Sequence, residues 1–162
     1  MEAPRMQDVI AKLRAKKDDE GFTLIELLVV VVIIGVLVAI AVPVYLNYRQ
    51  GAADKSAQSD VRGAISAIEQ YYTNNGNTYP TAAASATTSP LEIAGIGSGS
   101  KATITLSDKT QLAYVPKSGN TSAYLLCANN TGGSGKWYLY DSEAGGSVKT
   151  ATGTLKLTTC AA

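Results

Sequence analysis

The stretch that decides the fold is DDEGFTLIELLVVVVIIGVLVAIAVPVY, residues 18–45, in which a charged segment changes abruptly into an apolar one. Gly21 lies at the change, and Glu26 is the only ionisable side chain between residues 22 and 44. At about 1.5 Å per residue, a helix over 22–44 reaches roughly 34 Å, against a hydrocarbon layer of about 30 Å. In lipid this segment must be helical, because unpaired backbone groups are too costly there.

Three residues within the apolar run shape the expected helix. Gly35 and Ala39 form a small-x-x-x-small pair, so a second helix can approach closely on that face. Pro43 removes one backbone donor, and the sequence therefore predicts a kink near residues 39–43.

Helical periodicity continues after the proline, in the segment SAQSDVRGAISAIEQYYTNNGNTYP. The expected buried stripe, with spacings of three and four, is Ala57, Val61, Ala64, Ile65, Ile68 and Tyr72. The charged residues expected on the other faces are Asp54, Lys55, Asp60, Arg62 and Glu69. Gly76 suits a left-handed helix end. We therefore predict one helix over about 22–75, apolar all round over 22–44 and amphipathic over 45–76.

The remainder of the chain predicts an antiparallel sheet. Residues 77–101 are expected to form a long αβ-loop, with a short turn at PLEIAG. The strand patterns that follow are ATITL (102–106), QLAYVP (111–116), AYLLCA (123–128), KWYLYD (136–141) and a weaker GTLKLTTC (153–160). A meander of about four strands over 102–162 needs a cover for its apolar face, and the amphipathic helix supplies one. The predicted fold class is α+β.

Composition argues against an enzyme. The chain has no histidine, and its net charge is only +1. Asp108, Asp141 and Glu143 are interpreted as turn residues rather than a catalytic carboxylate pair, and no phosphate loop or metal-ligand spacing occurs, so we expect no cofactor and no metal. The lysines of the second half are spread out and favour a solvated surface over a nucleic-acid site; they are Lys101, Lys109, Lys117, Lys136, Lys149 and Lys156.

The two cysteines, Cys127 and Cys160, lie in the last quarter of the chain and form no C-x-x-C pair. This spacing argues against zinc and thioredoxin-like chemistry. If the second half is exported, a disulfide is the natural interpretation, and it would contribute about 3–4 kcal/mol in the chain-entropy description. Two unpaired buried thiols are the alternative.

The polarity switch has three interpretations. An ordinary secretory signal peptide would be cut after AIA (39–41), before Val42. An uncleaved anchor would keep the basic residues of the first segment in the cytoplasm and the second half outside. Cleavage between Gly21 and Phe22 would instead remove the charged leader and retain the apolar helix.

The third interpretation gives Glu26 a purpose. Cleavage would leave Phe22 with an α-amino group that is cationic at neutral pH. Glu26 lies four residues later, where the helix dipole favours a negative charge and where the carboxylate could approach an α-amino group of its own or of a neighbouring chain. Breaking a buried ion pair costs about 3–5 kcal/mol, so such a pair would fix the register between apolar helices. A carboxylate merely tolerated at the membrane interface is the alternative.

The segment GFTLIELLVVVVIIGVLVAIAVPVYLNYR, residues 21–49, resembles the N-terminal signature of type IV pilins and pseudopilins. The resemblance implies a class III signal peptide: residues 1–21 are a leader that a prepilin peptidase cuts after Gly21, and Phe22 is N-methylated. It also implies that Glu26 is required for assembly and that Pro43 is the helix-breaking proline of the filament spine.

The predicted layout of the second half also agrees with this family: a long helix, an αβ-loop, an antiparallel sheet, and a last segment bracketed by Cys127 and Cys160, like the disulfide-bounded region of many pilins. The resemblance therefore implies a type IV pilin-like fold. It covers residues 21–49 densely, and beyond residue 80 it concerns layout alone.

The implied function is that of a major pilin, the structural subunit of a type IV pilus used for adhesion, motility or DNA uptake. Such a subunit waits in the cytoplasmic membrane and is then polymerised with its own copies into an extracellular surface filament. The implied partners are the prepilin peptidase, an assembly ATPase, platform proteins, minor pilins, the membrane, and DNA or host surfaces. The alternatives are a major pseudopilin of a type II secretion or competence system, and a single-pass membrane-anchored or secreted binding module.

Overall fold

The computed structural model describes residues 21–94, 101–117 and 122–162. The chain divides into two compact units, Met1–Pro43 and Val44–Ala162. We call the second unit the head. The predicted leader up to residue 20 lies outside the described residues, as do residues 95–100 of the predicted αβ-loop.

The long helix, α2, begins at Leu24 and ends at Asn74, close to the predicted bounds of 22 and 75. Gly76, at φ +65°, provides the left-handed turn that the sequence predicted for the helix end. The amide of Asn77 then donates to the carbonyl of Tyr72 at 3.0 Å, the long-range bond of a Schellman motif. This bond satisfies one of the carbonyls that the end of any helix leaves free.

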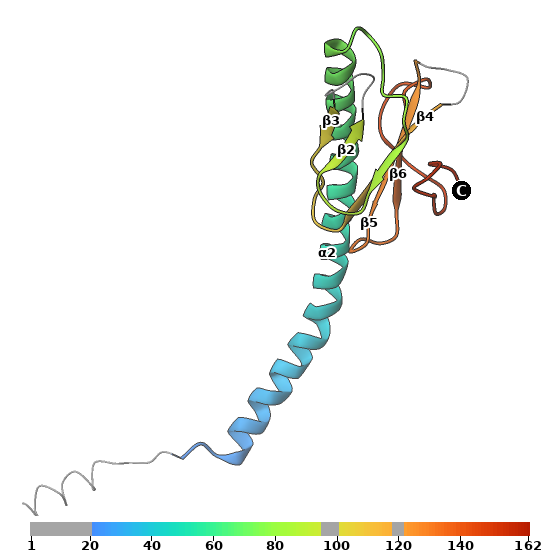
Figure 1. The fold of residues 1–162 in the computed structure, drawn as a ribbon. Coiled ribbons are helices and arrows are strands. Elements are labelled where there is room, and N and C mark those ends of the chain that lie inside the picture. The colour runs from blue at the N-terminus through green and yellow to red at the C-terminus, as the bar shows by residue number, and fades with distance from the viewer. Residues whose placement is uncertain (1–20, 95–100, 118–121) are drawn as a thin grey trace, which may run out of the picture. The chain divides into compact units, whose positions relative to one another are not determined.

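Five antiparallel strands form the main sheet, in the order β1-β4-β5-β6-β7. Their bounds are β1 (Ala84–Ala86), β4 (Thr110–Pro116), β5 (Tyr124–Asn130), β6 (Trp137–Asp141) and β7 (Lys149–Thr150). The sheet lies beside the second half of α2 (Figure 1). The prediction of a helix packed on an antiparallel sheet is therefore confirmed, and the three central strands were each predicted to within a few residues.

A second, two-stranded sheet pairs β2 (Leu91–Ala94) with β3 (Lys101–Ile104). The predicted turn at PLEIAG and the predicted place of 102–106 in the main meander were both wrong. The reason is the alternation in β2: Leu91 and Ile93 are buried, whereas the residues that follow each of them are exposed. This short alternating pattern gives one apolar face, which packs on the core beside the helix.

The predicted weak strand at 153–160 was also wrong, because this segment turns instead of extending. Gly153 has φ +94°, and the amide of Cys160 donates to the carbonyl of Lys156 at 2.8 Å. Leu155 and Cys160 are both buried. The segment therefore serves as a cover for the sheet rather than as a member of it.

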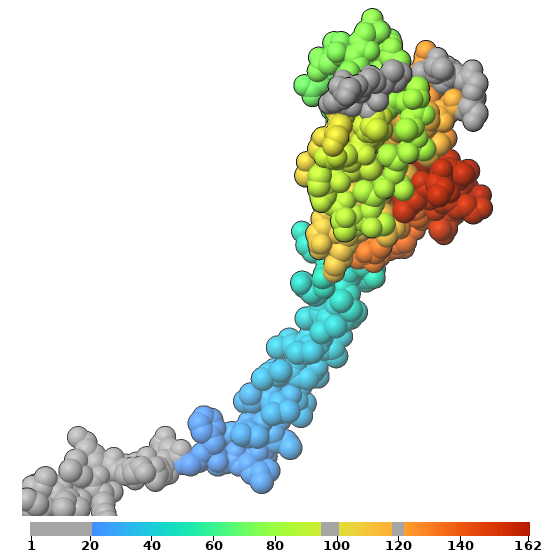
Figure 2. Space-filling model, viewed as in Figure 1, coloured from blue at the N-terminus to red at the C-terminus, as the bar shows by residue number. Residues whose placement is uncertain are grey.

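The sheet is buried on both faces. Leu112 and Tyr114 of β4 belong to the core between sheet and helix, whereas Ala113 between them belongs to a smaller cluster on the opposite face. That second cluster consists of Ala113, Cys127, Trp137, Leu155 and Cys160. Figure 2 shows the C-terminal segment, in red, packed against the orange strands. The central strands consequently read as nearly continuous apolar runs.

The buried stripe of α2 differs slightly from the prediction. Its buried members are Asp54, Ala57, Val61, Ala64, Ile68 and Tyr71. Ile65 is partly buried, and Tyr72 lies at the edge of the interface, where its ring stacks on Tyr79 with centroids 4.4 Å apart. An acidic residue thus occupies the first position of the stripe, which hydrophobic periodicity alone does not predict.

Candidate functional site

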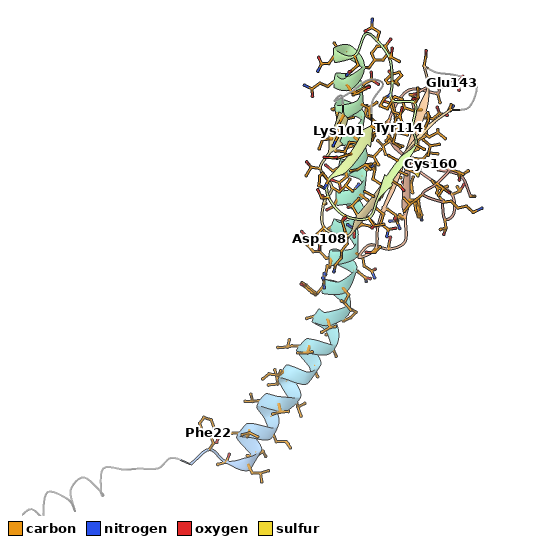
Figure 3. All side chains as sticks on the ribbon, viewed as in Figure 1. Phe22, Lys101, Asp108, Tyr114, Glu143 and Cys160 are labelled. Carbon is orange, nitrogen blue, oxygen red and sulfur yellow. A yellow bond between two sulfur atoms is a disulfide. The ribbon has the colours of Figure 1, made fainter. Side chains whose placement is uncertain are left out.

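The candidate assembly site lies at the start of α2, where Phe22 is exposed (Figure 3). Glu26 lies in the first turn of the helix, and Thr23 is the residue directly before the helix begins. The Oε2 atom of Glu26 accepts hydrogen bonds from the amide and from the hydroxyl of Thr23, each at 2.8 Å. In return, the amide of Glu26 donates to the Thr23 hydroxyl oxygen at 3.3 Å. This reciprocal arrangement is a capping box.

The capping box changes the interpretation of Glu26. A helix start has four amides without helical partners, and this pair of side chains satisfies two donors there. The carboxylate is also held where the helix dipole favours a negative charge. Glu26 therefore has partners within its own chain, whatever a neighbouring chain supplies. Thr23 was not predicted as part of the site, although the spacing T-x-x-E at 23–26 before an apolar run is the sequence signature of this motif.

The apolar half of α2 offers a continuous surface for association. The large apolar side chains from Leu24 to Val44 are each at least 48 % exposed in the single chain. A methyl group added at Gly35 would have no heavy atom within 4 Å, so the backbone is open to close approach there. The helix is long and apolar enough to cross a membrane. Pro43 lies inside continuous α-helix, and the kink predicted there stays a prediction.

In the head, acidic side chains of the amphipathic half of α2 accept hydrogen bonds from the loops and strands that pack on the helix. Asp54 is only 3 % exposed, and its carboxylate accepts bonds from the amide of Ser134 at 3.0 Å and from the Ser134 hydroxyl at 2.5 Å. Lys136 adds a cation 3.7 Å away. Gly133 makes this contact possible, because a Cβ at that position would overlap the Asp54 carboxylate.

Two further acids repeat the arrangement along the helix. The carboxylate of Asp60 accepts from the amide and the hydroxyl of Ser107, at 2.8 and 2.9 Å. Glu69 accepts from the hydroxyl groups of Tyr79, at 3.0 and 3.1 Å, and of Tyr124, at 2.8 Å. The prediction that these acids face solvent was wrong, because each one satisfies donors of the loops and strands that cover the helix.

The bonds to Glu69 lie in a cluster of tyrosine rings. Tyr124 contacts Tyr79 at a centroid distance of 5.0 Å, Tyr114 at 5.5 Å and Tyr140 at 6.0 Å. Burial, together with the hydrogen bond to Glu69, raises the pKa of Tyr79 to about 12. The same two causes raise the pKa of Tyr124 further, and burial raises the pKa of Tyr114. These rings therefore stay protonated far above the usual tyrosine range.

The disulfide predicted between Cys127 and Cys160 is present, with 5.5 Å between the Cα atoms and 33 residues between them in sequence. It joins the centre of β5 to the C-terminal segment. The bond lies within the second core cluster, next to Trp137. It therefore holds the C-terminal segment against the face of the sheet that the helix leaves open.

The three acids predicted as turn residues lie at two places in the head. Asp108 is exposed, and its carbonyl accepts from the side-chain amide of Asn130 at 2.9 Å. Asp141 and Glu143 both bind Lys117, at 2.8 and 2.7 Å. Burial raises the pKa of Asp141, but the hydrogen bond from Lys117 and two backbone amides outweigh it and lower that pKa. The hydrogen bonds to Asp141 and Glu143 in turn raise the pKa of Lys117.

The other predicted lysines are exposed on separate elements, and Lys101 binds Glu92 at 2.7 Å. Within residues 21–94, 101–117 and 122–162, no group of three or more histidine, cysteine or acidic side chains could hold a metal ion. The described residues provide a capped helix start, an exposed apolar helix and a head whose C-terminal segment is held by a disulfide.

Comparison with known proteins places the N-terminal region in a family. Residues 16–42 match the family described as "Prokaryotic N-terminal methylation motif". The chain is 44% identical over 57 residues to type IV major pilin protein PilE1 of Neisseria gonorrhoeae, covering 35% of this chain and 34% of that protein. It is also 39% identical over 69 residues to type II secretion system core protein G of Escherichia coli (strain K12), covering 43% and 47%.

A third relative, fimbrial protein EcpC of Eikenella corrodens, is 41% identical over 61 residues, covering 38% of this chain and 40% of the relative. The chain thus spans about a third to a half of the length of these curated relatives. The N-terminal motif and the long helix packed on an antiparallel sheet agree with one another. By these two features, the chain is similar to type IV pilins and pseudopilins in its N-terminal region and consistent with them in its fold.

Proposed function

We propose that this chain is the major structural subunit of a type IV pilus. The observation that carries the proposal is the exposed apolar half of α2, from Leu24 to Val44, preceded by the processing and capping residues 21–26. So much apolar surface is incompatible with a chain free in water, and it needs either lipid or other copies of the same helix. A subunit that moves from a membrane into a filament meets both conditions in turn.

The first step is maturation. A prepilin peptidase would cut between Gly21 and Phe22, and methylation would follow at the new amino group of Phe22. Both residues precede the helix and are exposed, which supports access by a processing enzyme. Cleavage leaves Thr23 and Glu26 in place, so the capping box is retained in the mature subunit.

The second step is assembly, driven by an ATPase and platform proteins of the membrane. The carboxylate of Glu26 lies beside its own Thr23 in the single chain. In the filament it would approach the cationic amino group of Phe22 on a neighbouring subunit. A buried carboxylate without a cation costs several kcal/mol, so only the axial offset that pairs these groups is favourable. Glu26 thereby selects the register of apolar helices that could otherwise pack at several axial offsets.

When the subunit moves from the membrane into the filament, its apolar helix exchanges lipid contacts for contacts with other apolar helices. The hydrophobic gain is therefore small, and close packing at Gly35 and Ala39 supplies part of the association energy. We propose that Pro43, which lacks a backbone donor, lets the helix adapt its bend in the filament. Because the contact between copies is heterologous and does not close, it propagates into a fibre with the heads outside.

A second candidate function is supported by one of the relatives. The match to type II secretion system core protein G extends over 69 residues, further than the match to the major pilin. In this alternative, the chain is a major pseudopilin of a secretion or competence system. The same N-terminal maturation and register apply, but the filament serves export or uptake and does not form a long surface fibre.

The mature N-terminus tests the shared part of both proposals. Intact mass and N-terminal sequencing of the protein from its native membrane should give a chain that begins at a methylated Phe22. A chain that begins at Val42 would indicate ordinary secretion, and one that retains Met1 would indicate a plain membrane-anchored binding module. Either result would contradict the filament proposal.

Whether fibres are present on the cell surface distinguishes the major pilin from the pseudopilin. Fibres sheared from cells at native expression should contain this chain as their main component if it is a major pilin. If no such fibres exist, and deletion of the chain blocks release of secreted proteins, the pseudopilin assignment replaces it.

A further inference from the structure

The end of the head at which its helix begins carries a cluster of exposed basic residues. Arg49 lies on the first turns of α2 within the head, and it lines a hollow of about 270 Å³ together with Lys109, which belongs to the turn before β4. Lys136, just before β6, is exposed and lies 3.7 Å from the Asp54 carboxylate of the same helix. Lys55 is exposed on the helix itself. Arg49 and Lys109 thus line one hollow, Lys136 lies beside Asp54, and Lys55 is the residue after Asp54 on the helix.

The acids at this end only partly balance the cations at the surface. Asp54 is buried; its carboxylate binds Ser134 and lies 3.7 Å from the Lys136 ammonium, whose charge it partly offsets. Asp60 binds Ser107. Asp108 is the one acid of this end that is exposed among the described residues, and Figure 3 places it at the end of the head next to the helix. The exposed charge at this end is consequently positive.

This basic end follows the apolar segment directly in the chain. The apolar run of the sequence ends at Val44. Tyr45 and Tyr48, which are 63 % and 79 % exposed, follow within four residues, and Arg49 comes directly after Tyr48. Exposed tyrosines next to a span are typical of the membrane–water interface, where the ring meets the acyl boundary and the hydroxyl meets water. Arg49 therefore follows the apolar segment closely enough in the sequence to reach lipid headgroups.

Most of the described acids of the head are already paired within the chain, which weakens the complementarity for a second copy. Glu92 binds Lys101, and both Asp141 and Glu143 bind Lys117. Glu69 is engaged by two tyrosine hydroxyls. Lipid phosphates, in contrast, are plentiful at the end of a membrane span. Charge complementarity thus favours an anionic membrane surface as the occupant.

We propose that the basic end of the head, formed by Arg49, Lys55, Lys109 and Lys136, rests on anionic phospholipid headgroups while the subunit waits in the membrane. The proposal rests on the membrane insertion in the proposed function and adds a second contact to it. Each basic residue near an anionic surface strengthens such a contact about fivefold. The contact would orient the head before assembly, and extraction into the filament would have to break it.

The test uses the full chain inserted in lipid nanodiscs at one subunit per disc. A neutral, water-soluble acylating reagent labels lysine amines, and mass spectrometry gives the rate for each lysine. In phosphatidylglycerol discs at low salt, we expect Lys109 and Lys136 to be labelled several-fold more slowly than in phosphatidylcholine discs. High salt should remove the difference, because the contact is screened. Lys101 and Lys156 of the same head serve as internal controls and should keep one rate.

A matched pair of variants tests the mechanism. Arg49→Gln removes a cation of the basic end without removing a labelled lysine, and it should reduce the protection of Lys109 about fivefold. Arg62→Gln removes an exposed arginine further along the same helix and should leave the protection unchanged. An equal effect of the two variants would contradict docking by the basic end.

The remaining outcomes are also decisive. Inserted chains whose Lys109 and Lys136 react equally fast in both lipids would overturn the docking while leaving the membrane anchor intact. Protection that ignores lipid charge and grows with the number of subunits per disc would identify a second copy as the occupant and would also overturn it. A chain that does not enter the discs would contradict the anchor itself, and the docking with it.

Discussion

At the scale of single residues, Glu26 has one partner in the structure, Thr23, and a second in the proposed filament, and the two partners require different chemistry. The capping box with Thr23 needs an acceptor at the third helical position, which a glutamine side chain also supplies. The register contact with the Phe22 amino group of a neighbour needs a negative charge. Substitutions can therefore separate a helix cap from an assembly device.

We expect Glu26→Gln to abolish filaments, because it keeps the cap but removes the charge that selects the register. Thr23→Ala should instead destabilise the helix start by about 0.5–2 kcal/mol while leaving the carboxylate in place, so filaments should form in reduced amount. Electron microscopy of sheared fibres and the level of membrane-held subunit measure both effects. Thr23→Ser is the conservative control and should resemble the wild type. Normal filaments from Glu26→Gln would show that capping is its whole role.

A second prediction concerns Gly133, which leaves room for the buried carboxylate of Asp54. Gly133→Ala should displace Asp54 from Ser134 and leave buried donors without partners, at a cost of about 1–3 kcal/mol. Gly63→Ala is the matched control: its added methyl group meets nothing within 4 Å, and it should stabilise the helix by up to about 1 kcal/mol. Denaturant unfolding of the two variants measures the difference. A Gly133→Ala protein as stable as Gly63→Ala would contradict the close contact.

Some of these residue contacts could be predicted from the sequence, and others could not. The capping box at 23–26 is a local motif with a fixed spacing, so it could have been predicted. The contact of Asp54 with Ser134 joins residues 80 positions apart, and nothing near Asp54 in the sequence distinguishes it from a solvated acid. Hydrophobic periodicity assigns polar residues to the outside by default, which fails wherever a polar side chain satisfies donors of a covering loop.

At the scale of elements, the C-terminal segment depends on its disulfide. Removing the bond with Cys127→Ser and Cys160→Ser should lower the free energy of unfolding by about 3–4 kcal/mol, given the 33-residue separation. The segment should also loosen from the sheet. Trp137, which is only 6 % exposed and is the single tryptophan, would then contact water and shift its fluorescence to the red. A blue, unchanged emission in the double variant would mean that Leu155 and its neighbours hold the segment without the bond.

Elements were predictable where their pattern is local. The three central strands have apolar runs bounded by turn residues, and the helix end has Gly76. The hairpin of β2 and β3 was missed because LEIA is short and lies in a stretch rich in small polar residues. The C-terminal segment resembled a strand in its alternation, but Gly153 and the bond at Cys160 impose turns on it. Such tertiary constraints override strand propensity.

At the scale of the whole molecule, the tyrosine cluster links stability to high pH. The pKa of Tyr79 rises from about 10 to about 12 on folding, so its contribution is fully present below pH 10 and is lost as the pH rises through 12. The pKa of Tyr124 is raised further and acts with the same sign. Denaturant midpoints between pH 8 and pH 12 should therefore fall steadily above pH 10. Tyr79→Phe should flatten this decline, and an unaltered slope would contradict the assignment.

The two outermost strands of the main sheet, β1 and β7, are only three and two residues long. An exposed strand edge is a template on which another molecule can pair its backbone. Short edges offer few free backbone groups for such pairing. In the proposed filament, neighbouring heads would thus contact one another through side chains without joining into a common sheet. Lengthening either edge strand would allow neighbouring heads to pair their backbones and aggregate irreversibly.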